Sequence, residues 1–175
     1  MKTFWIILAF VLPLGFLIGL AIWAKDIWDK VTFTPYFVKA DLKGLNLQDV
    51  QALLAGEERT IEAILGMEIK NESNSSITIS GLKAKLYYLG TPLAETSDEL
   101  AETKYVIEAN NVNNPLQITD SVTIHLNKAG ARLLADKIAG NKPRIDYTID
   151  LSVLGIPIGK VLRALGFSKD LYFEW

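Results

Sequence analysis

The chain has 175 residues and a formal net charge of −2, from 18 basic and 20 acidic side chains. It contains no cysteine, which excludes disulfides, thiolate metal sites, cysteine nucleophiles and lipoprotein-type acylation. It also has no strongly basic stripe and no basic cluster interleaved with aromatic residues, so we expect no nucleic-acid partner.

Residues 4–24 are uncharged and mostly apolar, and only Met1, Lys2 and Thr3 precede them. As a helix, such a run reaches roughly 30 Å, enough to cross the hydrocarbon core of a bilayer. The sequence therefore predicts two parts: a transmembrane anchor and linker over residues 1–30, and one folded domain over residues 31–175. The residues that define the anchor are Phe4, Trp5, Pro13, Gly15, Gly19, Trp23 and Ala24.

The charges that flank the apolar run predict its orientation. Lys2 and the amino terminus are positive, whereas the charges over residues 25–30 cancel. The positive-inside rule then favours a single-pass membrane protein with a short cytoplasmic N-terminus and an exported C-terminal domain. The alternative is a cleaved signal peptide, because residues 19–21 are Gly-Leu-Ala and cleavage would leave Ile22 first. The apolar run is longer than the usual core of a signal peptide.

The two glycines of the apolar run, Gly15 and Gly19, are four residues apart and share one helix face. This spacing lets a second transmembrane helix approach closely, although glycines are also common in lone anchors. We expect weak self-association or a protein partner at the membrane-proximal end of the domain.

Alternating apolar residues predict strands along most of the domain. Pro35 suits an edge strand, Gly81 marks a phase slip typical of a bulge, and Asp120-Ser121 interrupts another alternation. The clearest core faces are expected from Ile61 to Ile69 and from Ile145 to Val153. The expected strands cover residues 31–42, 60–69, 77–88, 105–109, 116–126, 144–154 and 171–175.

Helices are expected to be few and short. Asn46 is a candidate N-cap for a helix over residues 47–55, and Asn127 for one over residues 128–139. Residues 161–165 are helix-like, and residues 93–102 are polar and suit an edge or loop. The predicted fold class is therefore all-β: an antiparallel β-sandwich with one or two short helices, plus the N-terminal transmembrane helix.

Three segments together resemble the late embryogenesis abundant (LEA) group 2 family, which includes the WHy (water stress and hypersensitive response) domain. The first two are MEIKN at 67–71 and ITISGLKAKLYYLG at 77–90, which is followed by PLA at 92–94. The third is YTIDLSVLGIPI at 147–158. One departure is that the family's Asn-Pro step is Asn71-Glu72 here. A generic β-sandwich is the alternative.

Candidate chemistry is sparse. His125 is the only histidine, and its alternation with Ile124 and Leu126 should point it towards solvent. No Gly-x-Ser-x-Gly elbow accompanies it, and one imidazole does not make an ordinary zinc site. We therefore expect no enzyme, no catalytic residue, no metal and no cofactor.

Two further polar clusters have structural interpretations. The acidic residues Glu95, Asp98, Glu99 and Glu102 lack calcium-loop spacing and suit a solvated edge. Asn71 and Asn74 each begin a glycan-acceptor triplet, but a turn built from Asn and Ser explains them more simply.

Aromatic residues gather near both ends of the domain sequence. If terminal strands are neighbours, they could form one membrane-proximal patch that contacts lipid or a partner, although ordinary core and rim packing is the simpler interpretation. These residues are Phe33, Tyr36, Phe37, Tyr172, Phe173 and Trp175.

The resemblance implies a membrane-tethered, non-catalytic binding or protective module that acts in a stress response on lipids or envelope proteins. The alternative function is a structural subunit of a membrane-associated assembly, such as a virion or envelope machine, docked through its β-sandwich.

Overall fold

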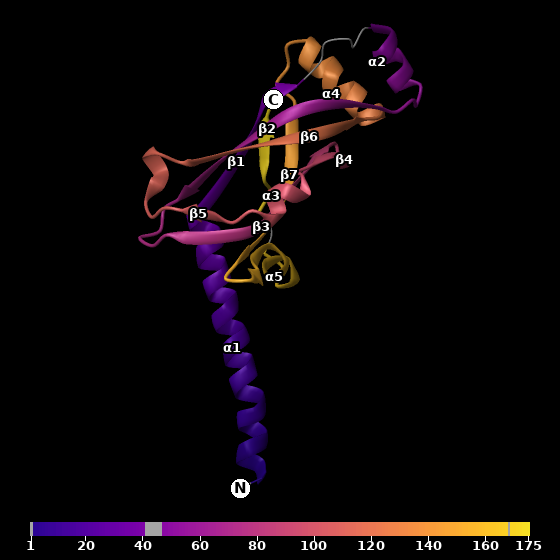
Figure 1. The fold of residues 1–175 in the computed structure, drawn as a ribbon. Helices are drawn as coiled ribbons and strands as arrows, with labels where there is room; N and C mark the ends of the chain where they lie inside the picture. The colour runs from indigo at the N-terminus through magenta and orange to yellow at the C-terminus, as the bar shows by residue number, and fades with distance from the viewer. Residues whose placement is uncertain (1, 41–46, 168) are drawn as a thin grey trace.

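The computed structural model describes residues 2–40, 47–167 and 169–175, with side chains described in 15–40, 48–167 and 169–175. A three-stranded antiparallel sheet, sheet A, has the order β1 (Val31–Ala40), β2 (Arg59–Asn71), β6 (Leu116–Leu126). Figure 1 shows this sheet running from the junction with the N-terminal helix to the opposite end of the domain. Pro35 lies in β1, an edge strand of sheet A, as predicted.

The second antiparallel sheet, sheet B, is built around β3 (Ile77–Tyr88) and β7 (Arg144–Val153). On its other side β3 pairs with β5 (Tyr105–Ile107) and β4 (Thr91–Glu95). The outer partners of β7 are β8 (Ile156–Pro157) and β9 (Tyr172–Glu174). Sheets A and B approach each other on both sides, at β1 and β9 and at β4 and β6, so the β structure is curled.

One hydrophobic core lies between the two sheets, and it uses the faces that the alternation predicts. Ile145, Tyr147, Ile149, Leu151 and Val153 of β7 are all buried. On β2 the buried run starts two residues later than expected, since Ile61 is only half-buried. The prediction of an antiparallel, mostly β domain with short helices is confirmed.

Two local predictions are confirmed in detail. The register of β3 against β7 shifts between Ser80 and Lys83, and Gly81 between them has a φ of 64°, which favours glycine. The side chain of Asn127 accepts hydrogen bonds from the backbone N–H groups of Ala129 and Gly130, and so caps α4 (Lys128–Ile138). The expected cap Asn46 lies outside the described residues, although α2 (Leu47–Leu54) follows it.

The domain has more helical turns than the one or two expected. Besides α2 and α4, the described residues form α3 (Asp98–Glu102), α5 (Ile158–Ala164) and a 3-10 turn, η1 (Asn111–Asn113). The polar stretch 93–102 is therefore the end of edge strand β4 followed by α3. Ser97 explains the helix, because its hydroxyl accepts a hydrogen bond from the N–H of Leu100.

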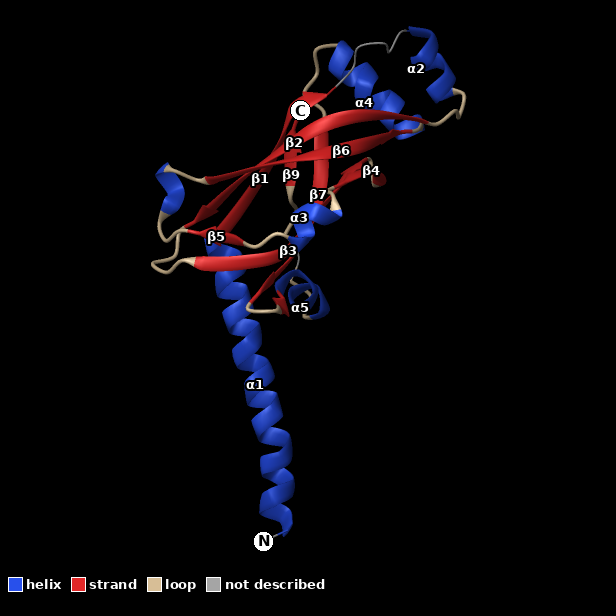
Figure 2. Cartoon of the chain, viewed as in Figure 1, coloured by secondary structure: helices blue, strands red, loops and turns tan. Residues whose placement is uncertain are grey.

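The N-terminal helix α1 spans Lys2–Lys30, so the segment expected as a linker is its last turns. Lys25 pairs with Asp29, and Lys30 with Asp26, each one helical turn apart, which stabilises this end. Figure 2 shows α1 projecting from the β domain. Within the part of the chain whose side chains are described, no helix is both long and apolar enough to span a membrane.

Asn71 holds the turn between β2 and β3 to the loop before β6, and its role exceeds the expected local turn. The residue is fully buried, and its side-chain amide donates to the carbonyls of Ser75 and Glu108. Its backbone N–H donates to the side-chain oxygen of Asn111 at 2.6 Å. A buried amide with every group engaged stabilises the fold and is unavailable as a glycan acceptor.

Candidate functional site

A cleft opens between β4 and β6, the outer strands of the two sheets. Its volume is about 660 Å³, and we call it the β4–β6 cleft. Because Asn127 caps α4, the cleft lies at the end of the domain where α2 and α4 sit, opposite to α1 (Figure 1). Its lining consists of Glu58, Arg59, Thr60, Lys85, Tyr87, Pro92, Leu93, Ala94, Glu95, His125, Leu126 and Asn127.

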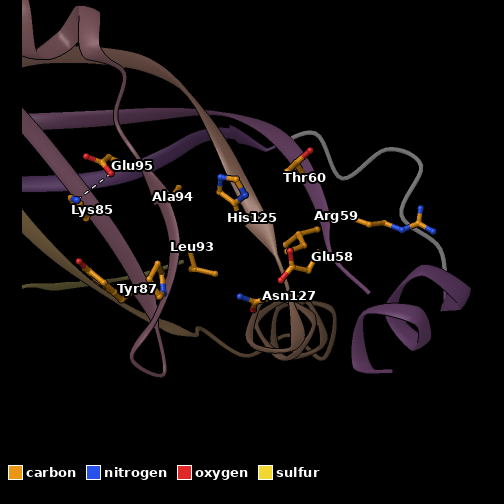
Figure 3. A pocket seen from close by; sticks show the side chains of 12 residues that line it. Glu58, Arg59, Thr60, Lys85, Tyr87, Leu93, Ala94, Glu95, His125 and Asn127 are labelled. Atoms are coloured by element: carbon orange, nitrogen blue, oxygen red, sulfur yellow. Dashed lines mark ion pairs between the residues drawn. The ribbon is translucent and has the colours of Figure 1, made fainter. Parts of the chain in front are cut away.

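The cleft walls combine a charged rim with an apolar floor. Leu93 and Leu126 are almost fully buried at its base. On one wall Lys85 pairs with Glu95 at 3.2 Å, and Figure 3 shows this ion pair across from His125. Arg59 points away from the cleft towards α2, where its Nη1 lies 2.7 Å from Asp49. The cleft can therefore contact both polar groups and apolar side chains of a ligand.

A polar clip closes the same seam beside the cleft. The carboxylate of Asp120 on β6 accepts hydrogen bonds from the backbone N–H and the hydroxyl of Ser97, each at 2.7 Å. The sequence suggested that Asp120 breaks the alternation of β6, but in the structure the alternation continues through it. Asp120 keeps the inward phase, with no register shift against β2, because Ser97 satisfies its charge.

His125 is exposed on β6, as predicted, and it lines the cleft. The other ionisable groups of the lining are Glu58, Arg59, Lys85, Tyr87 and Glu95, and the lining contains no serine or cysteine nucleophile. Across the described residues no group of three or more His, Cys, Asp or Glu side chains is placed to hold a metal ion.

Two of the four acidic residues at 95–102, Glu95 and Asp98, have cationic partners. Lys83 contacts Asp98 at 2.6 Å and Glu95 at 4.0 Å. The hydrogen bond with Lys83 holds the pKa of the Asp98 carboxyl below its usual range, and the same bond raises the pKa of Lys83. The stretch lies at the solvated edge of sheet B, as predicted, and its first part is ion-paired.

The six terminal aromatic residues divide into separate groups. Phe33 is buried near α1, 6.3 Å from the Trp28 ring, and Tyr36 lies over Gly66 and hydrogen-bonds Gln117. Phe37, Phe173 and Trp175 pack together, with centroid distances of 5.8 and 5.1 Å from Phe37.

The group of Phe37, Phe173 and Trp175 lies at the end of β1 that is farther from α1, because Lys137 of α4 sits over the Trp175 ring. Tyr172 is half-exposed beneath Arg144. The aromatic residues therefore do not form a single membrane-proximal patch, in line with the simpler interpretation of core and rim packing: β9 pairs with the start of β7, at the end away from α1.

The predicted anchor residues also fall into different environments. The side chains of Phe4, Trp5 and Pro13 lie outside the described side chains. No atom of the described residues lies within 4 Å of a Cβ built on Gly15 or Gly19, so these residues leave that face open. Ala24 is fully buried, and Trp23 packs on the core, because the end of α1 lies against α5. These two residues belong to the domain's packing.

Sequence reasoning missed three features of the site. The cleft depends on two strands from different sheets, and no local pattern reveals such a juxtaposition. The Ser97–Asp120 clip had one signal, a serine three residues before Leu100 at the start of an acidic run, which is typical of an N-cap. No sequence signal indicated that Ala24 packs against the domain.

No protein-family model matches the chain, and no curated protein matches it. Among solved structures, it is similar to a crystal structure of a protein from Archaeoglobus fulgidus, with 12% identity and a TM-score of 0.33. That match covers 82% of this chain and 90% of the other. A second is a solution structure of a protein titled as a candidate LEA protein, with 16% identity and a TM-score of 0.24. It covers 94% of this chain and 84% of the other. Similarities at this level carry no argument about fold or function, so LEA group 2 membership stays a prediction.

Proposed function

We propose that this protein is a membrane-tethered, non-catalytic binding module whose β4–β6 cleft takes up an extended segment of polypeptide. Helix α1 is the tether, with the N-terminus cytoplasmic and the domain exported. The observation that carries the proposal is the β4–β6 cleft, where the edges of two sheets part within one molecule.

The tether is supported by the surface of α1. Its described part projects from the domain with large apolar side chains facing outwards: Phe16 is 70% exposed and Ile22 is 65% exposed. Leu17 and Ile18 are more than half exposed as well. In water such a helix would be poorly soluble, whereas in lipid the same side chains are favourably placed. Residues 4–24 carry no charge.

The choice of ligand follows from the strand edges. β4 and β6 each end the strand order of their sheet among the described residues. An outer strand presents backbone N–H and C=O groups that an added strand can pair with. Past the Ser97–Asp120 clip the two edges separate around the apolar floor of the cleft. A polypeptide can satisfy the edge groups and place alternate side chains on Leu93 and Leu126.

A direct test uses the full chain in lipid nanodiscs and a library of random peptides. The variant His125→Trp should fill the cleft from an exposed strand position without disturbing the core. The matched control is Thr119→Trp, on the same face of β6 and opposite Gly66, outside the cleft lining. Selected peptides should bind His125→Trp at least about tenfold more weakly, a loss of about 1.4 kcal/mol, and bind Thr119→Trp unchanged.

Two results would refute the polypeptide ligand. One is the absence of any enriched peptide over empty nanodiscs. The other is equal binding to both tryptophan variants, which would place the contact elsewhere on the domain. Hydrogen exchange adds an independent measure, since pairing with β6 should slow exchange at residues 124–126 more than at residues 117–119.

The second candidate function, a structural subunit of a membrane-associated assembly, is favoured by the open face at Gly15 and Gly19. A second transmembrane helix could pack closely on that face. Recovery of a stoichiometric complex in mild detergent would support this function, and its loss in Gly15→Leu/Gly19→Leu would locate the contact. A monomeric protein that binds peptides would support the first.

A further inference from the structure

Two turns of the domain have a sequence that their conformation disfavours. Leu89-Gly90 joins β3 to β4, and Leu154-Gly155 joins β7 to β8. Both leucines have positive φ, 50° and 52°, and each is followed by a glycine with positive φ. In such two-residue turns the first position favours asparagine, aspartate or glycine, because other side chains crowd the backbone there. The conformation of these turns therefore does not by itself favour either leucine.

Leu154 is also the most exposed large hydrophobic side chain among those described, at 82%. It stands beside the tether, since Trp23, Asp26, Ile27 and Leu154 line one shallow hollow of the surface. On the domain side of α1 lies α5, whose C-cap residue, Leu165, is 49% exposed. In Figure 1 the β7–β8 region and α5 lie alongside the upper part of α1.

The length of α1 sets the level of this part of the domain relative to a bilayer. From Lys2 to Ile22 the helix rises about 31 Å, roughly the thickness of the hydrocarbon core. Ala24 is fully buried against the domain, so the free length of α1 ends there. Trp23, Leu154 and the end of α5 then fall at the headgroup level, where apolar side chains and indoles gain free energy.

We infer that the Leu154 turn and the end of α5 form a second, interfacial contact with the bilayer that α1 crosses. This inference rests on the proposed tether. The contact would fix the tilt of the domain, so that the β4–β6 cleft faces away from the membrane. Leu89 provides a matched control, because it has the same turn conformation and is 64% exposed on the β3–β4 turn, away from α1.

Because the chain has no cysteine, a single introduced cysteine can be labelled specifically. The full chain, as Leu154→Cys, Leu89→Cys or Ile18→Cys, is labelled with an environment-sensitive fluorophore and reconstituted in phosphatidylcholine vesicles. Circular dichroism checks that each variant folds. Quenching is measured with iodide in the buffer, and separately with nitroxides on lipid headgroups or on acyl chains.

We expect the label at position 154 to be at least about threefold less accessible to iodide than the label at 89, and to be quenched by headgroup nitroxides. The label at 18 should be quenched by acyl-chain nitroxides. Equal iodide access at 154 and 89 with a shielded label at 18 would overturn the second contact and leave the tether intact. If iodide quenches the label at position 18, the tether is refuted. If iodide also quenches the label at position 154, the second contact is refuted as well. A shielded label at 154 would then show a surface contact without a spanning helix.

Discussion

The two sheets meet along two seams, and the seams are built from different chemistry. On one side β1 meets β9 through Phe37, Phe173 and Trp175, with Tyr147 next to Phe173 at 6.2 Å. On the other side β4 meets β6 through the Ser97–Asp120 clip, and beyond it the cleft opens. Interlocking aromatic rings exclude water along a seam, whereas a local polar clip fixes one point and lets the edges diverge. The difference explains why the β4–β6 cleft opens along this seam.

The largest effect should come from breaking the aromatic seam. Phe173→Ala removes a ring that is 92% buried (8% exposed) and touches two others. The cavity and the lost apolar burial should lower the free energy of unfolding by about 3–4 kcal/mol. Chemical denaturation followed by tryptophan fluorescence measures this, and Tyr172→Ala, at the half-exposed neighbour, is the control. A loss below about 1 kcal/mol would show that the seam relaxes and does not close the fold.

Alkaline pH should weaken the aromatic seam next. Burial raises the pKa of Tyr147 to about 12, from an ordinary value near 10, and its hydroxyl donates to the carbonyl of Phe33. Because the folded-state pKa is the higher one, the stabilisation is complete below pH 10 and is lost as pH rises towards 12. The decline should approach about 2 kcal/mol for this group.

Tyr88, at the end of β3, should show a similar titration where it contacts α4. Its hydrogen bond to Asp136, together with burial, raises the pKa of Tyr88 to about 12. Urea unfolding between pH 9.5 and 11.5 should therefore show a shallower decline in Tyr147→Phe and in Tyr88→Phe than in the unmodified chain. An unchanged slope in either variant would mean that its tyrosine titrates normally in the folded protein.

A smaller loss should follow from opening the polar clip. Asp120→Ala removes the acceptor of two Ser97 hydrogen bonds and leaves a partly buried N–H without it. The free energy of unfolding should fall by about 1–2 kcal/mol, and hydrogen exchange should accelerate around residues 96–100. Asp146→Ala, which breaks a surface pair with Arg144, is the control and should change little. Equal effects of the two variants would make the clip an ordinary surface contact.

The seams also show what a sequence can predict. The inward phases of β3 and β7, the bulge at Gly81 and the cap at Asn127 all depend on neighbours within a few residues, and each is confirmed. Which strand edges meet depends on the whole topology. Phe37 and Phe173 are 136 positions apart, and nothing local indicates that they touch.

The charged residues show the same limit. Asp120 reads as a break in an alternation, because a carboxylate at an inward position is costly without a partner. Its partner Ser97 is the N-cap of α3, 23 positions earlier in the chain. Likewise Ala24 reads as the end of an apolar run, and only the position of α5 makes it a buried contact. The candidate cleft could not be predicted for this reason, whereas the lone exposed His125 that lines it was predicted from its strand phase.

The smallest change in stability should come from the cleft wall, where the effect on binding should be larger. Lys85 and Glu95 are both nearly half-exposed, so Lys85→Ala should alter the free energy of unfolding by less than about 0.5 kcal/mol. Removing Lys85 leaves Glu95 with the more distant Lys83, which makes the wall more negative. Peptides with basic residues should then bind more tightly and acidic ones more weakly, most clearly at low salt. The control is Lys70→Ala, which breaks the Lys70–Glu68 pair outside the cleft lining. It should change neither the free energy of unfolding nor the preference for basic or acidic peptides. Identical peptide preferences in all three proteins would remove the charged wall from the binding site.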